Sequence, residues 1–338
     1  MSSSTEKPAS PVLFVGGAGA VGSRAVRALR QLHPRLPIWI GGRDLAKAAA
    51  LADEIGSAGA VAIDLTRPDL GLPAEAAPSG VVMLLKDDSL LSLKYAQAKK
   101  IPYIAFSNWL FDIGPEVAHF VHAPRSAPVL LLGHILGGTV TLAALHFAGQ
   151  FRTVDAIELG AVLDSDDSGG PAAQGDMDRI ANVPNPPLVR GGKWHWAVGD
   201  DAVRRFKDAG GAEHLGRAIP VLDVASLAAA TLATSVRVDL AVRDAKSRPA
   251  GSGLSHEVII EIAGEKRDGA TGRFRYEYAD GRGHSVTSGF GAALAAERLL
   301  GLAGGPPPAP GLYCPESLLD PVYVIERMRQ FGTRIRPL

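Results

Sequence analysis

The sequence has little of what several classes of protein require. Its 338 residues include one cysteine, Cys314, which cannot close a disulfide within the chain or supply the paired Cys and His ligands of a structural zinc site. Its 35 basic residues balance its 35 acidic ones, so the basic excess typical of nucleic-acid-binding proteins is missing. We therefore expect no metal and no nucleic-acid partner.

No stretch of the sequence is typical of a signal peptide or a membrane span. The first eleven residues are polar and lack the apolar run of about 7 to 15 residues that a signal peptide carries. Residues 126–151 contain no Asp, Glu, Lys or Arg, but Gly137 and Gly138 divide this run into a part that suits a buried strand and a part that suits a packed helix. We expect a cytoplasmic protein without a membrane partner.

A glycine-rich turn follows the first apolar run of the chain. Residues 12–29 read VLFVGGAGAVGSRAVRAL, which is a β-rich run, then glycines, then apolar residues at helical spacing. The pattern G-x-G-x-x-G allows a tight turn, close approach of a pyrophosphate, and close packing of the following helix, whose N-terminus attracts phosphate. It predicts a dinucleotide site, and a purely structural turn is the alternative. The expected contacts are Gly16, Gly17, Gly19, Ala20, Val21 and Gly22.

The end of the second predicted strand favours NADP over NAD. An NAD site usually has an acidic residue about 20 residues beyond the last glycine, where it binds the ribose 2′-hydroxyl. This chain has Gly41-Gly42-Arg43 there, which leaves room for a 2′-phosphate and offers a guanidinium to pair with it. The alternative for Arg43 is a solvated residue in the first turn of the next helix. Asp64, at the end of the third strand, either lies beside the adenine or caps a turn.

The order of predicted elements indicates an α/β protein with more than one domain. Residues 11 to about 135 alternate apolar β-rich runs with helical segments, which predicts a Rossmann-type doubly wound parallel sheet. From Val154 the β-formers alternate or cluster around one helix, which predicts a second α+β domain on a mostly antiparallel sheet. We expect a dinucleotide-binding domain at 1–135, a substrate and dimerisation domain at 136–287, and C-terminal helices that return to the first domain at 288–338.

Several polar residues follow predicted parallel strands. Ligands of such sheets bind beyond the carboxyl ends of the strands, a rule that selects Lys86, Asp87, Asn108 and His134. With a pKa near neutrality, Lys86 or His134 could protonate the nitrogen or oxygen left after hydride transfer. The alternatives are a solvated lysine at a strand end and a core histidine. Asp87 and Asn108 are candidates for substrate binding.

The segment between the two predicted domains offers a second set of candidates. Residues 164–192 are rich in Ser, Gly, Pro and Asp and predict a long loop, which in compact domains is often a lid or a binding loop. Arg190 could hold a substrate carboxylate, although loop cations are usually solvated. Trp194, His195 and Trp196 could form a substrate wall; the alternative is that the indoles anchor the second sheet.

Three segments carry a likeness to a known family. Residues 12–29 with 41–56 form a nucleotide-binding start, 133–140 (GHILGGTV) form a glycine-rich crossing into the second domain, and 311–332 (GLYCPESLLDPVYVIERMRQFG) form a closing Pro-Glu helix. Together they resemble the saccharopine dehydrogenase-like family, which often has proline where this chain has Gly137. Its members include saccharopine reductases and lysine and carboxynorspermidine dehydrogenases. The resemblance implies NADP-linked hydride chemistry at a carbon–nitrogen centre.

We interpret the chain as an NADP-dependent oxidoreductase that reduces an imine or oxidises an amine of an amino-acid-like or polyamine-like small molecule. The cofactor carries the hydride, and the protein orients it and manages one proton. The alternative is a non-catalytic NADP-sensing module, which would explain why no acid/base motif stands out. The strand edges of the second domain favour pairing across a two-fold axis, so we expect a homodimer.

Overall fold

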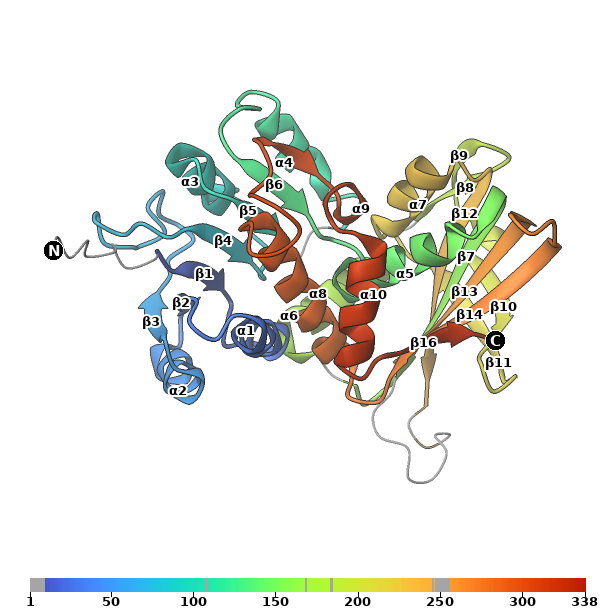
Figure 1. Ribbon diagram of the computed structural model, residues 1–338, viewed down its shortest axis with the longest axis horizontal. Coiled ribbons are helices and arrows are strands. Elements are labelled where there is room, and N and C mark those ends of the chain that lie inside the picture. The colour runs from blue at the N-terminus through green and yellow to red at the C-terminus, as the bar shows by residue number, and fades with distance from the viewer. Residues whose placement is uncertain (1–9, 107–108, 168, 183–184, 245, 247–255) are drawn as a thin grey trace, which may run out of the picture.

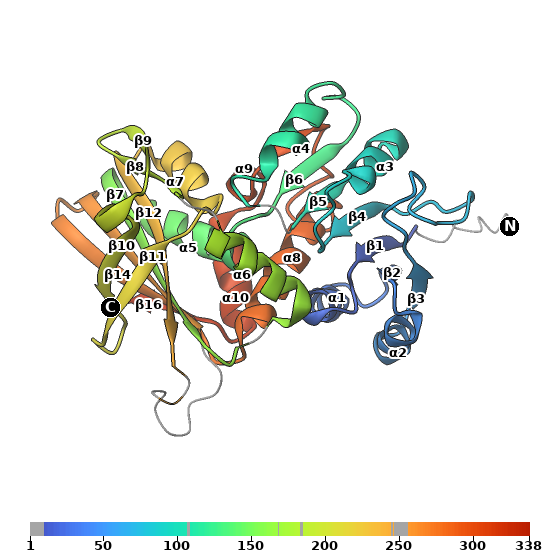
Figure 2. The ribbon, with the colours of Figure 1, turned by 180° about the vertical axis from the view of Figure 1, so that it is seen from behind.

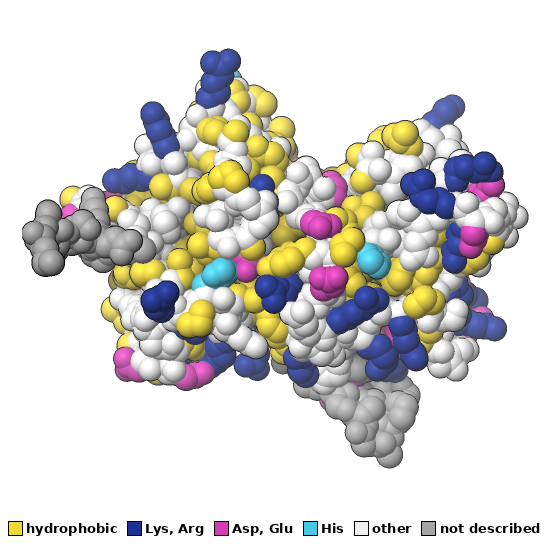
Figure 3. Space-filling model, in the orientation of Figure 1, with side chains coloured by type: hydrophobic (Ala, Val, Ile, Leu, Met, Phe, Trp, Pro, Cys, Tyr) yellow, Lys and Arg dark blue, Asp and Glu magenta, His cyan; other side chains and the backbone are white. Residues whose placement is uncertain are grey.

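The computed structural model contains two sheets that lie side by side and are joined through helices (Figure 1). It describes residues 10–106, 109–167, 169–182, 185–244, 246 and 256–338. The surface is notched between the two lobes (Figure 3). Among the described residues, no helix has the length and apolar character needed to cross a membrane.

The first sheet has seven strands, and every adjacent pair is parallel. In spatial order they are β15 (Gly311–Tyr313), β6 (Pro128–Leu131), β5 (Tyr103–Ala105), β4 (Gly80–Met83), β1 (Val12–Val15), β2 (Ile38–Gly42) and β3 (Ala58–Ala62). The chain order reverses at β1, next to which β2 and β4 lie on opposite sides. This is the point where ligands bind in doubly wound sheets. The predicted α/β fold with a parallel sheet is confirmed.

Helices cover both faces of the first sheet. Phe14 of β1 packs in one core with Leu29, whereas the next residue along, Val15, packs in the other core with Leu93, because successive side chains of a strand point to opposite faces. The helices on the first face are α1 (Ala20–Leu32), α2 (Leu45–Ile55) and α8 (His284–Leu299). Those on the second face are α3 (Leu91–Lys99) and α4 (Ile113–Phe120).

The second sheet is mostly antiparallel, as the alternating β-formers predict. Only the β7–β12 pair is parallel among its described strand pairs. The main path runs β10 (Val203–Lys207), β11 (Glu213–Ala218), β12 (Ser235–Arg243), β7 (Phe151–Asp164), β13 (His256–Lys266), β14 (Thr271–Asp280) and β16 (Arg334–Pro337). Beside it are β8 (Pro187–Arg190), β9 (Lys193–Trp196) and the short helix η2 (Gly199–Ala202).

The charge-free run of the sequence is the connection between the two sheets. It contains β6, the short helix η1 (Ile135–Gly138) and α5 (Thr139–Ala148), whose side chains are largely buried. Phe147 of α5 stacks on Tyr276 of β14, with ring centroids 3.9 Å apart. Burial on all sides accounts for the lack of charge. The helices that pack near α5 are α7 (Asp223–Thr231), α9 (Pro315–Leu318) and α10 (Pro321–Gln330).

The prediction of a continuous loop at 164–192 is wrong. Residues Gly170–Asn182 form helix α6, which lies between the two sheets and reaches the start of α1 (Figure 2). A Cβ atom on Gly170 would lie 3.5 Å from the Cβ of Ala20. Small and polar residues hide the helix in the sequence, but Met177 and Ile180 both face the space between the sheets. Tertiary packing decides the conformation of this segment.

Candidate active site

The glycine turn has the backbone geometry that a phosphate-binding turn requires. Gly16 follows β1 with φ +81°, a conformation that L side chains rarely adopt. A Cβ atom on Gly22 would lie 2.2 Å from the carbonyl oxygen of Gly16, so any other residue would push α1 away from the turn. No side chain caps α1 and no acidic residue lies in its first turn. Its first N–H groups can therefore bind an anion.

The carboxyl end of β2, toward which an adenosine would extend from the glycine turn, is open. Nothing lies within 4 Å of a Cβ atom built on Gly42 at the end of β2. Arg43 is exposed and has no hydrogen bond or ion pair with any described residue. Asp64 closes a turn, because its carboxylate accepts hydrogen bonds from the Thr66 amide (2.9 Å) and hydroxyl (2.6 Å), and these bonds lower its pKa. Arg43 is thus available to a ligand, whereas one Asp64 oxygen has a structural role.

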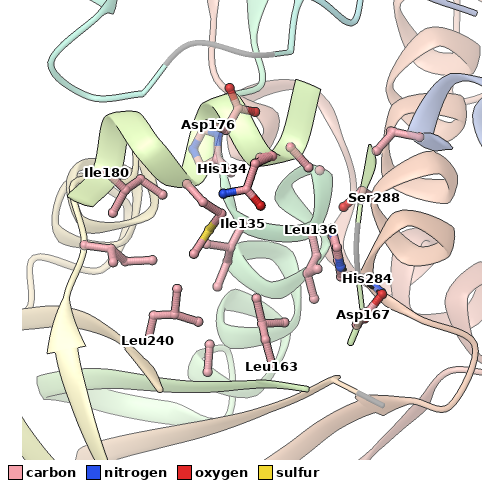
Figure 4. Close-up of a pocket in the computed structure, with 18 of the residues that line it drawn as sticks. His134, Ile135, Leu136, Leu163, Asp167, Asp176, Ile180, Leu240, His284 and Ser288 are labelled. Carbon is pink, nitrogen blue, oxygen red and sulfur yellow. Dashed lines mark hydrogen bonds and ion pairs between the residues drawn. The ribbon is translucent and has the colours of Figure 1, made fainter. Parts of the chain in front are cut away.

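A pocket of about 470 Å³ lies between the two sheets, next to the glycine turn. Val21, in the first turn of α1, lines one end of it, and Leu240 and Val258 of the second sheet line the other. Phe106 and His134 line it just beyond the carboxyl ends of β5 and β6. The pocket therefore occupies the place where the strand-end rule locates ligands, with α6 as its cover (Figure 4).

One wall of the pocket carries an imidazole beside a carboxylate. His284 begins α8, and its Nδ1 lies 3.1 Å from Oδ1 of Asp167. This is an ion-pair distance, although the angle is not that of a hydrogen bond. The His284 backbone amide donates to Oδ2 of Asp167 at 2.7 Å, which fixes the carboxylate at the helix N-terminus. Burial opposes ionisation of Asp167, but its contacts with His284 prevail and lower its pKa.

A second acidic group lies at the rim, on α6. Asp176 lines the pocket and accepts a hydrogen bond from Arg179 at 2.7 Å. Burial raises the pKa of Asp176 to about 6, against the opposing effect of Arg179. Asp112 lies 3.8 Å from the same Arg179 and 3.0 Å from Nζ of Lys86. Lys86 therefore belongs to a chain of ion pairs at the rim and does not itself line the pocket.

His134 lines the pocket from beneath and is 6% exposed. Its Nε2 lies 2.8 Å from the hydroxyl of Ser226, while Nδ1 has no partner among the described residues. Burial lowers the pKa of His134 to about 3. The ring is therefore neutral at pH 7. A proton donor with a pKa near neutrality, the role considered for His134 in the sequence analysis, would have to be another residue.

His134 also belongs to the one group of described residues with the composition of a metal site. One ligand atom each of His134, Cys314 and Glu316 lie within 4.8 Å of one another. Burial raises the pKa of the Cys314 thiol to about 11, so the thiol of the metal-free protein is protonated at pH 7. Nε2 of His134 lies 2.8 Å from the Ser226 hydroxyl, so one of its two possible ligand atoms already has a protein partner.

A buried carboxyl group holds the crossing between the sheets in shape. Asp223, at the start of α7, accepts the backbone amide of Ile135 at 2.9 Å and the hydroxyl of Thr141 at 2.5 Å. Burial raises the pKa of Asp223 to about 7. Leu136 and Gly137 between these contacts adopt positive φ angles of 50° and 63°. Asp223 is thus a positioning residue for the segment that carries His134.

The other predicted site residues that the structure describes do not line the pocket. Both carboxylate oxygens of Asp87 accept hydrogen bonds at the start of α3, from Ser89 and Ser92. Arg190 pairs with Asp201 at 2.9 Å on an exposed surface. Asn108 lies outside the described residues. Trp194, His195 and Trp196 form an aromatic triplet that is exposed on β9, and none of the three lines the pocket.

The sequence analysis missed Asp167, Asp176 and His284. The two aspartates lie in the segment interpreted as a loop, and His284 follows a glycine-rich turn 117 residues after Asp167. A signal existed for the helix, because Ala173, Met177 and Ile180 have helical spacing. No local pattern could have paired His284 with Asp167.

Comparison with known proteins identifies the fold. No family model and no curated protein sequence matches the chain. Apo saccharopine dehydrogenase (L-Glu forming) from Saccharomyces cerevisiae superposes with a TM-score of 0.61 at 15% identity, covering 98% of this chain and 100% of that one. Homospermidine synthase from Legionella pneumophila, in complex with NAD, gives 0.65 at 11% identity, covering 97% and 91%. An oxidoreductase from Agrobacterium radiobacter, in complex with NAD⁺, L-tartaric acid and magnesium, gives 0.51 at 14% identity, covering 97% and 98%. The chain has a saccharopine dehydrogenase-like fold.

Proposed function

We propose that the chain is an NADP-dependent oxidoreductase that transfers hydride at a carbon–nitrogen centre, by imine reduction or amine oxidation. The observation that carries the proposal is that the pocket begins at Val21, in the first turn of the helix that follows the glycine turn. A dinucleotide bound by its pyrophosphate at that turn has its reactive ring within reach of the pocket. The NAD complexes of structures with this fold support a nicotinamide cofactor.

The residues present fit such a cofactor. A Cβ atom at Gly22 would collide with the turn, and the open end of β2 beside Arg43 leaves room for a 2′-phosphate. When bound, the cofactor supplies or accepts the hydride. Arg43 would pair with the 2′-phosphate, and Val21 would pack at the pocket end of the groove.

We assign the proton to His284. Its ring lines the pocket, and the Asp167 carboxylate lies 3.1 Å from its Nδ1, so a carboxylate adjoins the imidazole where a proton would be transferred. In the direction of imine reduction, His284 would give a proton to the nitrogen while its carbon neighbour receives hydride. Lys86 and His134 stay alternatives for this step. Lys86 would have to leave Asp112, and His134 would act as a neutral hydrogen-bond partner of the substrate.

Cofactor preference is tested by fluorescence titration of NADPH and NADH. Arg43→Ala should weaken NADPH binding roughly 10- to 100-fold and leave NADH unchanged, because a charge-assisted contact contributes about 1.5–3 kcal/mol. Arg35→Ala is the matched control, since Arg35 is also exposed but lies before β2, at the opposite end of that strand. Equal affinity of the unmodified protein for both cofactors would overturn the NADP assignment.

Turnover separates an enzyme from an NADP-sensing module. His284→Gln should reduce NADPH oxidation by an imine about 100-fold or more with NADPH affinity retained, because general acid catalysis contributes about that much. His122→Gln, at an exposed position on the first lobe, is the control. Lys86→Met and His134→Gln test the two alternatives in the same assay. NADPH binding without turnover of any imine would favour the sensing module. The ionisable groups that line the pocket make that module the weaker candidate.

A further inference from the structure

The lining of the pocket combines a polar wall, an extensive apolar surface and further polar side chains, among them those of His134 and Gln174. Asp167, His284 and Ser288 lie together on one side, and Asp176 lies at the α6 rim (Figure 4). The remaining surface comes from both sheets, η1 and α6. Its apolar side chains include Phe106, Trp109, Ile135, Leu136, Leu163, Met177, Ile180, Ile219, Leu240 and Val258.

We propose that the substrate is a largely apolar amine or imine with one nitrogen and no carboxylate. This inference rests on the proposed function and names its substrate class. It departs from the amino-acid-like or polyamine-like molecule that the sequence analysis expects. A pocket of about 470 Å³ is large enough for a ring-bearing compound of this kind.

A carboxylated substrate would lack a lysine or arginine partner in this pocket. No lysine or arginine is among the described residues that line it. The cations behind the lining are already paired, with Arg243 2.6 Å from Asp164 and Arg179 2.7 Å from Asp176. A carboxylate moved from water to such a surface loses its hydration without gaining an ion pair, which strongly disfavours binding. The same surface stabilises an apolar group of equal size.

The charges on the pocket wall suit a single cationic nitrogen. Among the described residues, the ion-pair partner of Asp167 is the imidazole of His284, and neither a lysine nor an arginine pairs with it. A protonated amine at this wall would restore the positive charge that Asp167 requires. Among the described lining residues, the other two acidic groups already have cationic partners, because Asp164 pairs with Arg243 and Asp176 with Arg179. A polyamine would therefore bury a second charge without a partner.

Three imines with the same five-membered ring test the substrate class. These are 2-phenyl-1-pyrroline, 2-methyl-1-pyrroline and 1-pyrroline-2-carboxylate, which differ only at the carbon that receives hydride. NADPH oxidation by the full-length protein should give a kcat/KM for the phenyl compound at least about 100-fold above that for the carboxylate, with the methyl compound between them. Equal values, or a preference for the carboxylate, would overturn the inference while supporting imine reduction.

Binding provides a readout that does not depend on turnover. Calorimetry of the protein saturated with NADPH, which cannot take hydride from an amine, should detect 2-phenylpyrrolidine but not proline, the saturated forms of the first and third imines. If no imine is reduced but this binding preference holds, the proposed function fails and the substrate-class inference stands. If proline binds equally well or better, or neither amine binds, the inference fails.

A substitution in the apolar wall tests the cause of the preference. Leu240→Arg places a cation among the lining residues. It should reduce the ratio of kcat/KM for the phenyl imine to kcat/KM for the carboxylate imine at least about tenfold. Leu232→Arg is the control, because Leu232 is 83% exposed and does not line the pocket. An unchanged ratio in a folded Leu240→Arg protein, judged by retained NADPH affinity, would contradict the assignment of this wall to the substrate.

Discussion

Two buried imidazoles should make the stability of the protein sensitive to mild acid. Among the described residues, the hydrogen-bond partner of His134 is Ser226, and Nε2 of His256 lies 3.1 Å from the hydroxyl of Thr287. Both side chains are nearly or fully buried, and burial lowers their pKa values to about 3 and about 4. An unfolded chain would have both near 6.5, so it binds these protons first as the pH falls. The stability from each neutral ring is fully present above pH 6.5 and is lost progressively below it.

The size of the effect follows from the difference in proton binding. Between pH 7 and pH 5 the unfolded chain takes up about 0.7 proton at His134, and the folded chain takes up almost none, which lowers the free energy of unfolding by about 2 kcal/mol. His256 contributes a similar amount. Asp223 acts in the opposite direction, because its raised pKa of about 7 makes the folded state bind the extra proton as the pH falls. The pH dependence of the free energy of unfolding of one protein therefore combines several groups. The difference in pH dependence between the unmodified protein and a His134 variant isolates the contribution of His134.

The assay is urea unfolding at pH 7, 6 and 5 for the unmodified protein and for His134→Asn. The variant should lose about 2 kcal/mol less stability between pH 7 and pH 5 than the unmodified protein does. His122→Asn, at an exposed site, should keep the original pH dependence. The reasoning would be refuted if the loss of stability between pH 7 and pH 5 differed by less than about 0.5 kcal/mol between His134→Asn and the unmodified protein. His134 would then take up protons equally in the folded and unfolded states.

Three other expectations address the cofactor, the pocket and the assembly. Gly22→Ala should weaken NADPH binding at least about tenfold, because the new Cβ would lie 2.2 Å from the Gly16 carbonyl, whereas Gly175→Ala has open space and should bind normally. Asp176→Asn should remove an ionisation near pH 6 from the pH profile of NADPH turnover, and a profile of unchanged shape would contradict the raised pKa of Asp176. Light scattering should give the mass of a homodimer, and a monomer at every concentration would refute pairing of the second sheets.

The features that could be predicted from the sequence are those whose conformation is determined by residues within one short segment. The glycine turn is such a case, since Gly16 and Gly22 constrain each other across six residues of chain. The parallel sheet is another, because strands buried on both faces read as continuous apolar runs. Even the charge-free run could be divided correctly at Gly137, where the chain passes from β6 through η1 into α5.

The aromatic triplet shows why the size of a side chain does not decide its location. Trp194 and Trp196 are 57% and 68% exposed on β9, although large apolar side chains are usually expected to be buried. Strand β9 pairs only with β8 among the described strands and lies off the main path of the sheet. Without a second layer over it, neither face of β9 can bury an indole. Such coverage depends on elements distant in the chain.

The chemistry of the pocket escaped prediction for a related reason. The strand-end rule examines only the parallel sheet, so it found His134 at one wall and Lys86 at the rim. The opposite wall is built where β7 ends and α8 begins, and there Asp167 meets His284. Asp167 also accepts the first amide of α8, so the interaction that starts the helix orients the imidazole as well. In the sequence, an aspartate that accepts a hydrogen bond from a helix N-terminus cannot be told from an ordinary capping residue. That Asp167 faces a pocket becomes evident only in the fold, where α8 lies beside it.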